Sequence, residues 1–267
     1  MDSFDPDVVL THAERYRVVE DPAMRAAELR VIGCDYGATS YTTRAQAERM
    51  AGMLGLAPGR VLLDIGTGAG WPGIHLAVTT GARVVLTDIP REGLGVAWRR
   101  LERDGVDCHV VAAAGHRLPF ADGAFDAVTS SDVLCCLPDK AATLAEARRV
   151  LRAGGRICFS VITIADGLPG PDRARAVTHG PPYVDAGAGY HSLLRGAGFT
   201  SVEELDVSEE FLSTATAWIE EWEAGAADLR PLVGEQTFDE RQATRSEANE
   251  VIASGLLRRS IVSAVRP

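Results

Sequence analysis

Five short apolar segments alternate with helical patterns between residues 60 and 164, and this alternation restricts the fold more than any other feature of the chain. The segments are rich in Val, Ile and Leu without regular polar alternation, which is typical of strands covered on both faces. Strands that alternate with helices predict right-handed βαβ units and a parallel sheet. The predicted strands span residues 61–65, 83–87, 109–113, 124–130 and 156–164, and the predicted helices span about 71–80, 91–103 and 140–151.

The two flanks of this region have a helical pattern instead. Residues 6–55 are predicted to be helical with breaks at Gly33 and Gly37, and residues 209–257 also follow helical spacing. We therefore expect helical units before the core and before its last strand. The predicted organisation is an N-terminal helical cap (1–55), an α/β core (56–207), a helical insertion (208–257) and the last strand of the core (258–267).

Three segments complete the predicted sheet and its ligand-binding end. Residues 202–207 and 260–265 are expected to form two further strands. Residues 167–189 contain many Gly and Pro residues, which predicts a long loop. This loop follows the fifth predicted strand, at the end of an open α/β sheet where ligands bind.

Composition narrows the classes of partner. The 267 residues carry a formal net charge of -10, which repels phosphate backbones and argues against nucleic-acid binding. The acidic N-terminus lacks an apolar stretch behind it, and no run is long enough to span a bilayer, so we expect neither a secretory signal nor a membrane partner. The five cysteines are odd in number and lack a C-x-x-C pattern. They favour reduced thiols in a cytoplasmic protein over a disulfide framework or a metal site.

The most informative motif is a glycine loop after the first predicted strand. That strand ends in Asp64, and Gly66, Gly68 and Gly70 follow at every second position. Glycines let the backbone turn sharply and let a ligand approach without interference from a Cβ atom. The spacing differs from the G-x-G-x-x-G of dinucleotide sites, and a carboxylate beside a pyrophosphate would be repelled. The motif therefore favours a ligand that carries positive charge.

A second acid closes the second predicted strand. Asp88 lies about twenty residues beyond the glycines, where a carboxylate accepts hydrogen bonds from two ribose hydroxyls. Ile89 would then lie against a flat base. The alternative is a surface aspartate that begins a turn before Pro90.

Four motifs together point to a family. The glycine motif, Asp88, the run at residues 117–126 and the run at 151–156 occur in the order typical of class I S-adenosylmethionine-dependent methyltransferases, which this chain resembles. The resemblance implies an α/β fold with a Rossmann-like, mostly parallel seven-stranded sheet, helices on both faces and an antiparallel last strand. It implies S-adenosylmethionine as the cofactor.

The resemblance also assigns roles to single residues. It places the glycine loop against the methionine part of the cofactor, Asp64 near its ammonium group and Asp88 on its ribose. The segment after the third strand borders the adenine, and residues 34–43 fold over the cofactor. The implied cofactor-binding residues are Tyr41, Asp64, Gly66, Thr67, Gly68, Trp71, Asp88, Ile89, Gly115, His116 and Ser130.

Fewer motifs in the sequence identify the residues that would bind and activate the methyl acceptor. A hydroxyl or carbon acceptor usually needs a general base, whereas an amine needs only its neutral form. Asp132, after the fourth strand, is the first catalytic candidate, and His179 and His191 are two more; capping or surface roles are the alternatives. His12 and Tyr16, one helical turn apart, are further candidates to reach the pocket. The expected substrate-binding residues are Tyr36, Tyr183, Trp218 and Trp222, for which packing is the alternative.

The predicted function is transfer of a methyl group to a small-molecule acceptor, with the acceptor atom (N, O or C) left open. The resemblance of residues 34–43 to enzymes that act on amines and natural products favours natural-product biosynthesis. A cyclase or rearrangement enzyme that binds S-adenosylmethionine without methyl transfer is the alternative, and the spacing argues against an NAD(P)-dependent oxidoreductase. We expect the insertion to form a lid, a homodimer interface or both.

Overall fold

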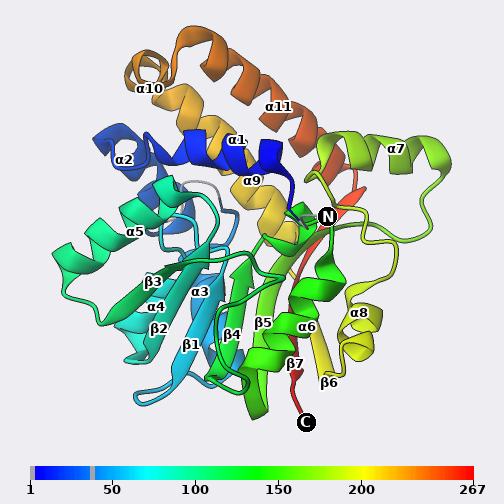
Figure 1. Ribbon diagram of the computed structural model, residues 1–267. Coiled ribbons are helices and arrows are strands. Elements are labelled where there is room, and N and C mark those ends of the chain that lie inside the picture. Colours follow the sequence, from blue (N-terminus) through cyan, green and yellow to red (C-terminus); the bar gives the residue numbers. More distant parts are fainter. Residues whose placement is uncertain (1–3, 37–39) are drawn as a thin grey trace.

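A computed structural model describes residues 4–36 and 40–267 and contains one seven-stranded sheet in the order β3-β2-β1-β4-β5-β7-β6. The strands from β3 to β5 pair in parallel, whereas β7 pairs antiparallel with both β5 and β6 (Figure 1). This confirms the predicted fold class, including the antiparallel last strand. The strands are β1 (Val61–Ile65), β2 (Arg83–Asp88), β3 (Cys108–Ala112), β4 (Phe125–Ser131), β5 (Leu151–Ile164), β6 (Thr200–Asp206) and β7 (Leu257–Val265).

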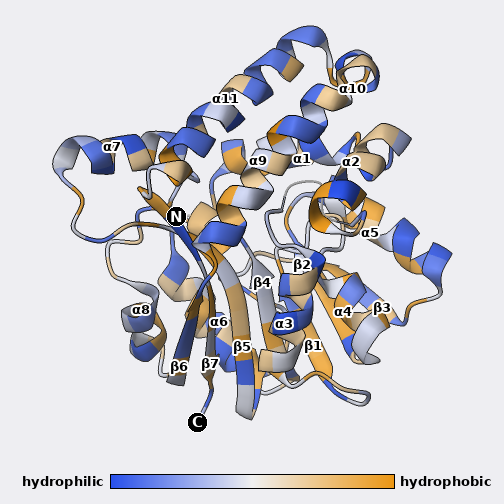
Figure 2. Ribbon diagram, turned by 180° about the vertical axis from the view of Figure 1, so that it is seen from behind, coloured by the Kyte–Doolittle hydropathy of each residue, from blue (hydrophilic) through white to orange (hydrophobic). Residues whose placement is uncertain are grey.

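Helices cover both faces of the sheet because successive strand residues point to opposite sides. Leu62 and its same-face neighbours pack with α3 (Arg44–Leu54), α4 (Gly73–Thr80) and α5 (Arg91–Asp104). Leu63 instead packs in the opposite core, which includes residues of α6 (Lys140–Val150) and α8 (Tyr190–Gly196). Figure 2, from behind, shows largely hydrophobic residues along the central strands, whereas the ribbons of the surrounding helices alternate between hydrophilic and hydrophobic residues.

The two helical flanks come together above the carboxyl ends of the strands (Figure 1). Three aromatic residues of the helix over residues 208–224, Phe211, Trp218 and Trp222, are buried. The helices that form this upper layer are α1 (Pro6–Tyr16), α2 (Pro22–Ile32), α9 (Ser208–Ala224), α10 (Ala226–Val233) and α11 (Glu235–Ala253).

The long loop predicted at residues 167–189 is wrong in its first half, where α7 (Gly170–His179) forms. Pro171 lies in the first turn, where a missing backbone N–H is tolerated. Ala176 is fully buried against the core, so burial of one small residue anchors a helix in a segment whose Gly and Pro content suggested none.

Of the helix breaks predicted in the first flank, Gly33 ends α2 in a left-handed conformation, whereas Gly37 lies outside the described residues. A short 3-10 turn, η1 (Leu134–Cys136), follows β4. Within residues 4–36 and 40–267, every helix is too short or too polar to cross a membrane.

Candidate functional site

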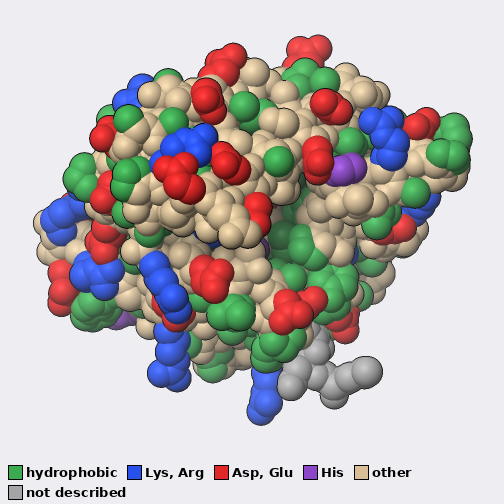
Figure 3. Space-filling view, turned by 90° about the horizontal axis from the view of Figure 1, so that it is seen from above, with side chains coloured by type: hydrophobic (Ala, Val, Ile, Leu, Met, Phe, Trp, Pro, Cys, Tyr) green, Lys and Arg blue, Asp and Glu red, His purple; other side chains and the backbone are tan. Residues whose placement is uncertain are grey.

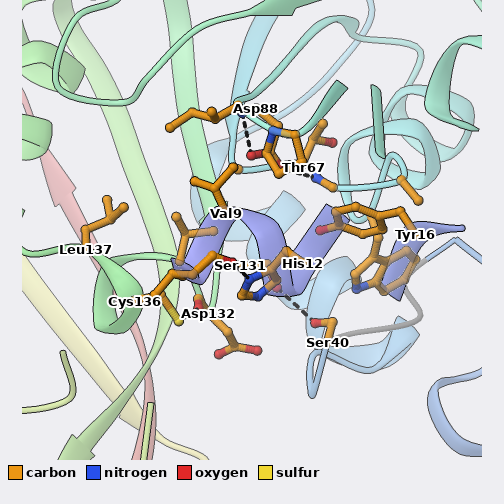
Figure 4. A pocket seen from close by; sticks show the side chains of 18 of the residues that line it. Val9, His12, Tyr16, Ser40, Thr67, Asp88, Ser131, Asp132, Cys136 and Leu137 are labelled. Atoms are coloured by element: carbon orange, nitrogen blue, oxygen red, sulfur yellow. Dashed lines mark hydrogen bonds between the residues drawn. The ribbon is translucent and has the colours of Figure 1, made fainter. Parts of the chain in front are cut away.

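Helix α1 closes a pocket over the carboxyl ends of β1, β2 and β4. Val9, His12 and Tyr16 project from α1, Thr67 lies in the glycine loop, and Asp88 ends β2 (Figure 4). We call this space the first pocket. Its empty volume, open mouth included, is about 850 Å³.

The glycine loop adopts backbone conformations that favour glycine. Gly66 has φ of 75° and Gly68 has φ of 55°, both in the left-handed region. A Cβ atom on Gly66 would lie 2.3 Å from a methyl carbon of Val133, and one on Gly68 would lie 2.4 Å from the Tyr16 hydroxyl oxygen. The missing side chains therefore let α1 and the segment after β4 approach the loop, in addition to leaving the loop bare toward the pocket.

Asp88 holds the glycine loop in place and lines the pocket. Its Oδ2 accepts a hydrogen bond from the Gly68 N–H (2.7 Å), and its Oδ1 accepts one from the Ile89 N–H (2.7 Å). Burial raises the pKa of Asp88 to about 6, although both hydrogen bonds act in the opposite direction. Each oxygen keeps a lone pair for a ligand hydroxyl.

The charge of the first pocket is one-sided. Among the described residues that line it, Asp5, Asp88 and Asp132 are acidic and none is Lys or Arg. Such a lining attracts a cationic ligand and repels a pyrophosphate. The glycine motif predicted the same preference from Asp64, but Asp64 does not line the pocket, so the preference rests on these three acids instead.

A second cavity joins the first beneath α1. Both are lined by Ser40, His12, Asp132 and Cys136, so these residues mark the junction. The second cavity lies among α1, α9 and α11, and its empty volume with its mouth is about 2200 Å³. Figure 3, from above, shows a hollow on this face with hydrophobic side chains at its bottom. A cofactor and an acceptor thus have adjacent spaces.

Asp132 at the junction is held by a fully buried arginine. Arg259 on β7 donates from Nε to Asp132 Oδ1 (2.8 Å) and from Nη2 to Oδ2 (3.0 Å). Asp132 Oδ1 also accepts from the Ser160 hydroxyl (3.0 Å). Asp132 has φ of 56°, which is uncommon for a residue with a side chain. Both oxygens are thus already engaged, which weakens the expectation that Asp132 acts as a free base.

The same arginine fixes residues 40–43, which we call the strap. Arg259 donates from Nη2 to Thr42 Oγ1 (2.6 Å) and from Nη1 to Gln46 Oε1 (2.8 Å). Two indoles hold the strap from either side: the Trp71 Nε1–H donates to the Thr42 carbonyl (3.0 Å) and the Trp218 Nε1–H donates to the Ser40 carbonyl (3.3 Å). The strap therefore forms a rigid wall at the junction.

His12 differs from Asp132 in having a free acceptor nitrogen. Its Nδ1 lies 2.8 Å from the Val8 carbonyl oxygen, which can only accept, so Nδ1 carries the proton. Nε2 is then the basic nitrogen. Burial lowers the pKa of His12 from its ordinary value, with a smaller contribution from Arg15 and against the opposing hydrogen bond to Val8, so the neutral ring is favoured near pH 7. Figure 4 shows His12 on α1 between Tyr16 and Ser131.

Many expected site residues line these two spaces, but two tyrosines lie in the space opposite to the one expected. Tyr36, expected on the acceptor side, lines the first pocket, whereas Tyr41, expected at the cofactor, lines the second cavity and packs edge-on against Phe211. The other expected residues in the first pocket are Gly66, Thr67, Gly68, Trp71, Asp88 and Ile89, those in the second cavity are His179, Trp218 and Trp222, and Asp132 borders both.

Four expected cofactor residues lie outside the lining of both spaces. Asp64 is fully buried beneath the glycine loop, where its Oδ2 accepts from the Gly73 N–H at the start of α4 (3.0 Å). Ser130, the second-last residue of β4, is buried. Successive side chains of a strand point to opposite faces, and it is the next residue, Ser131, that lines the pocket. Gly115 and His116 belong to a separate turn after β3, closed by the Arg117 N–H to Ala114 carbonyl bond.

Two acceptor-side candidates are also placed elsewhere. His191 on α8 pairs with Glu204 on β6 (2.8 Å between Nε2 and Oε2), near the edge of the sheet. The Tyr183 hydroxyl donates to Asp5 Oδ2 (2.8 Å), and Asp5 in turn caps the N-terminus of α1. Tyr183 therefore anchors the roof of the first pocket without lining either space.

The sequence prediction missed four arginines at the site. Arg259 is buried while its neighbour Arg258 is exposed, and only the register of β7 decides which one points inward. Arg15, Arg241 and Arg245 line the second cavity. The i, i+4 spacing of the last two was the one available signal, and it is also common on solvated helix faces.

The chain is similar to proteins of one known family. Residues 63–159 match a family model described as a methyltransferase domain. The methyltransferase GfsG of Streptomyces halstedii is 32% identical over 198 residues, which cover 71% of this chain and 69% of that protein. The 27-O-demethylrifamycin SV methyltransferase of Amycolatopsis mediterranei is 36% identical over 174 residues, which cover 63% of this chain and 64% of that protein. The matched segments thus span about two thirds of both relatives.

Solved structures share the fold. Phosphoethanolamine N-methyltransferase 2 of Haemonchus contortus, solved with phosphomonomethylethanolamine and S-adenosylhomocysteine, superposes with a TM-score of 0.79 at 18% identity. The superposition covers 94% of this chain and 58% of that one.

Replacement of Arg259 tests the buried network. Arg259→Met removes four hydrogen bonds and leaves Asp132 buried without its counter-charge, so we expect the free energy of unfolding to fall by about 3–5 kcal/mol. Arg258→Met is the matched control: Arg258 pairs with Asp206 on the surface, and its loss should change stability by less than about 1 kcal/mol. Urea unfolding measures both. Equal effects would contradict the inward placement of Arg259.

Asp64→Asn tests the buried acid beneath the glycine loop. Burial raises the pKa of Asp64 to about 7, against opposing hydrogen bonds. The folded state then binds more protons than the unfolded state, so wild-type stability falls as pH rises from about 4 to about 7. An uncharged amide still accepts from Gly73. The variant should therefore exceed the wild type by roughly 1–4 kcal/mol at about pH 8, with a smaller difference near pH 4.

Urea unfolding across this pH range checks that prediction. Asp107→Asn, at an exposed position, serves as the control and should stay within about 0.5 kcal/mol of the wild type. An Asp64→Asn difference that does not vary with pH would be inconsistent with a raised pKa.

Proposed function

The chain belongs to the class I S-adenosylmethionine-dependent methyltransferases, and from this premise we propose that it methylates a hydroxyl group of a small molecule in natural-product biosynthesis. S-adenosylmethionine, when bound, supplies a methyl group on a sulfonium that is already activated for transfer. The protein's task is to orient the two molecules, exclude water and accept the hydroxyl proton.

The first pocket fits this cofactor. Asp88 can accept from both ribose hydroxyls while it holds the glycine loop. Ile89 and Leu137 offer apolar surface to a flat base. The acidic lining matches a ligand whose sulfonium and ammonium groups are both cationic. Gly66 and Gly68 leave the loop bare toward the pocket, as a close backbone approach requires.

The position of His12 carries the proposal of an oxygen acceptor. This histidine borders both spaces, is neutral at pH 7 and directs a basic Nε2 away from its Val8 bond. A hydroxyl in the second cavity needs a base at this junction, because a neutral alcohol is a weak nucleophile. Asp132 serves a different purpose: with both oxygens held by Arg259, it positions the strap and the junction wall.

The name of one relative supports the substrate class. That relative is named as a methyltransferase of 27-O-demethylrifamycin SV, in which the methyl acceptor is an oxygen of a natural product. The expected alternative, a rearrangement enzyme that leaves S-adenosylmethionine intact, makes a different product and is separated from methyl transfer by the assay described below.

Asp88→Ala tests the cofactor site. Loss of the ribose hydrogen bonds should weaken S-adenosylhomocysteine binding by roughly 10- to 100-fold in a calorimetric titration. Asp107→Ala, at an exposed residue just before β3, should bind normally. Unchanged affinity in a folded Asp88→Ala protein would remove Asp88 from the cofactor site.

Methyl transfer and its base are tested with a panel of hydroxylated small molecules and S-adenosylmethionine. Mass spectrometry should find an acceptor heavier by about 14 Da together with S-adenosylhomocysteine. His12→Asn keeps a donor for the Val8 carbonyl but removes the base, so kcat should fall about 10²- to 10⁴-fold with little change in cofactor affinity.

The pH profile provides the second readout. Wild-type kcat/KM should fall as pH drops below the lowered pKa of His12, and this limb should vanish in His12→Asn. His191→Asn, at a histidine outside both spaces, should behave as the wild type. An isomerised product with intact S-adenosylmethionine would instead identify a rearrangement enzyme.

A further inference from the structure

Three arginines face the second cavity without carboxylate partners. Arg15 comes from α1, and Arg241 and Arg245 lie one turn apart on α11. Within residues 4–36 and 40–267, no carboxylate lies at ion-pair distance from any of the three, and the one side-chain hydrogen bond among them joins Arg245 Nη1 to Gln242 Oε1 (3.3 Å). All three side chains are half-buried. In a chain with a net charge of -10, this gathering of cations is unexpected.

The arginines lie over an aromatic floor. The Arg245 guanidinium carbon is 3.9 Å from the ring centroid of Trp222 and 6.0 Å from that of Trp218. Arg241 lies 5.8 Å from the Trp222 centroid. Stacking orients a planar guanidinium and leaves its N–H edges free to donate to an anion.

Electrostatics make this arrangement unfavourable when no anion is bound. Burial lowers the pKa of Arg245 to about 10; Tyr41 opposes this shift, and the positive charges of Arg15 and Arg241 contribute to it less than burial does. A bound anion would relieve both the desolvation and the mutual repulsion.

The acids and histidines around the cavity do not neutralise the three cations. Asp132 is engaged by Arg259. The histidines are His12, whose ring is neutral at pH 7, and His179, which lies 3.5 Å from Glu247. The remaining acids on the lining are Asp7, Glu14 and Glu240, all exposed at the rim, where water screens them.

We propose that the second cavity takes an acceptor with an apolar or aromatic body and an anionic oxygen group, a carboxylate or a phosphate, held by Arg15, Arg241 and Arg245. The apolar body would lie beside Trp218 and Phe211, and the reacting group would point to the junction at His12. The two spaces then differ in charge preference: the acidic first pocket takes the cationic cofactor, and the arginine-lined cavity takes an anionic acceptor. The inference rests on the proposed function, because it names the substrate class of that reaction.

A pair of fluorescent probes that differ mainly in one sulfonate tests this proposal. 8-Anilinonaphthalene-1-sulfonate carries the anion, and N-phenyl-1-naphthylamine has the same ring system without it. Both are titrated in the presence of saturating S-adenosylhomocysteine, which blocks the first pocket. The sulfonate should bind the wild type at least about ten-fold more tightly than the neutral probe, because charge-assisted hydrogen bonds add to the aromatic contacts.

Arginine variants test whether the preference for the sulfonate probe arises in the second cavity. Arg241→Met/Arg245→Met should weaken the sulfonate at least about ten-fold while the neutral probe changes by less than about two-fold, since Met preserves apolar bulk. Arg195→Met, at an exposed arginine on α8 outside the cavity, should leave both affinities unchanged. Equal binding of the two probes to the wild type, no binding of the sulfonate, or unchanged sulfonate binding in the double variant would overturn the proposal.

Displacement separates the two sources of the anion. Stronger displacement of the sulfonate by phenyl phosphate assigns a phosphate, stronger displacement by benzoate assigns a carboxylate, and displacement by neither overturns the proposal. S-adenosylhomocysteine titration of the same variants reports on the cofactor site independently. A failure of the methyltransferase assignment would therefore be seen as lost cofactor binding or absent methyl transfer, not as a change in probe preference.

Discussion

The ion pair between Arg259 and Asp132 is the constraint on which the rest of the site depends. Arg259 is fully buried on β7, and its guanidinium joins the end of β4, the strap and α3 through hydrogen bonds to Asp132, Thr42 and Gln46. A buried ion pair adds little net stability compared with apolar packing, but removing one partner is expensive. Its value here lies in geometry, because any other placement of these segments would leave a charge buried alone.

The strap and α1 together create two spaces with opposite requirements. Trp71 and Trp218 hold the strap through hydrogen bonds, while Tyr16 brings α1 onto the glycine loop. The lining of the first pocket has acids and no Lys or Arg among the described residues, whereas Arg15, Arg241 and Arg245 line only the second cavity, together with acids of its own. Because an arginine close to Asp88 would pair with it, the separation keeps Asp88 available to a ligand. His12 stands where they meet, neutral because it is buried.

Prediction from sequence succeeded where a local pattern reports directly on the environment. Continuous apolar runs identified buried parallel strands, and the glycine spacing with Asp88 located the first pocket. It failed where the decisive contact is distant. Asp64 lies only two residues before Gly66, yet it turns beneath the loop toward Gly73. Residues 170–179 form a helix because Ala176 reaches the core, a contact that Gly and Pro content does not report.

The sequence by itself determined the sheet, its flanking helices and a loop suited to a cationic nucleoside, since these follow from residue periodicity and from glycine's backbone freedom. Only the tertiary structure decided that Arg259 rather than Arg258 faces inward. It also decided that Tyr36 lines the first pocket and Tyr41 the second cavity, and that Arg15 lines the same cavity as Arg241 and Arg245. The reason is physical: strand register and helix docking bring together side chains more than a hundred residues apart, and their energies depend on burial that no local pattern specifies.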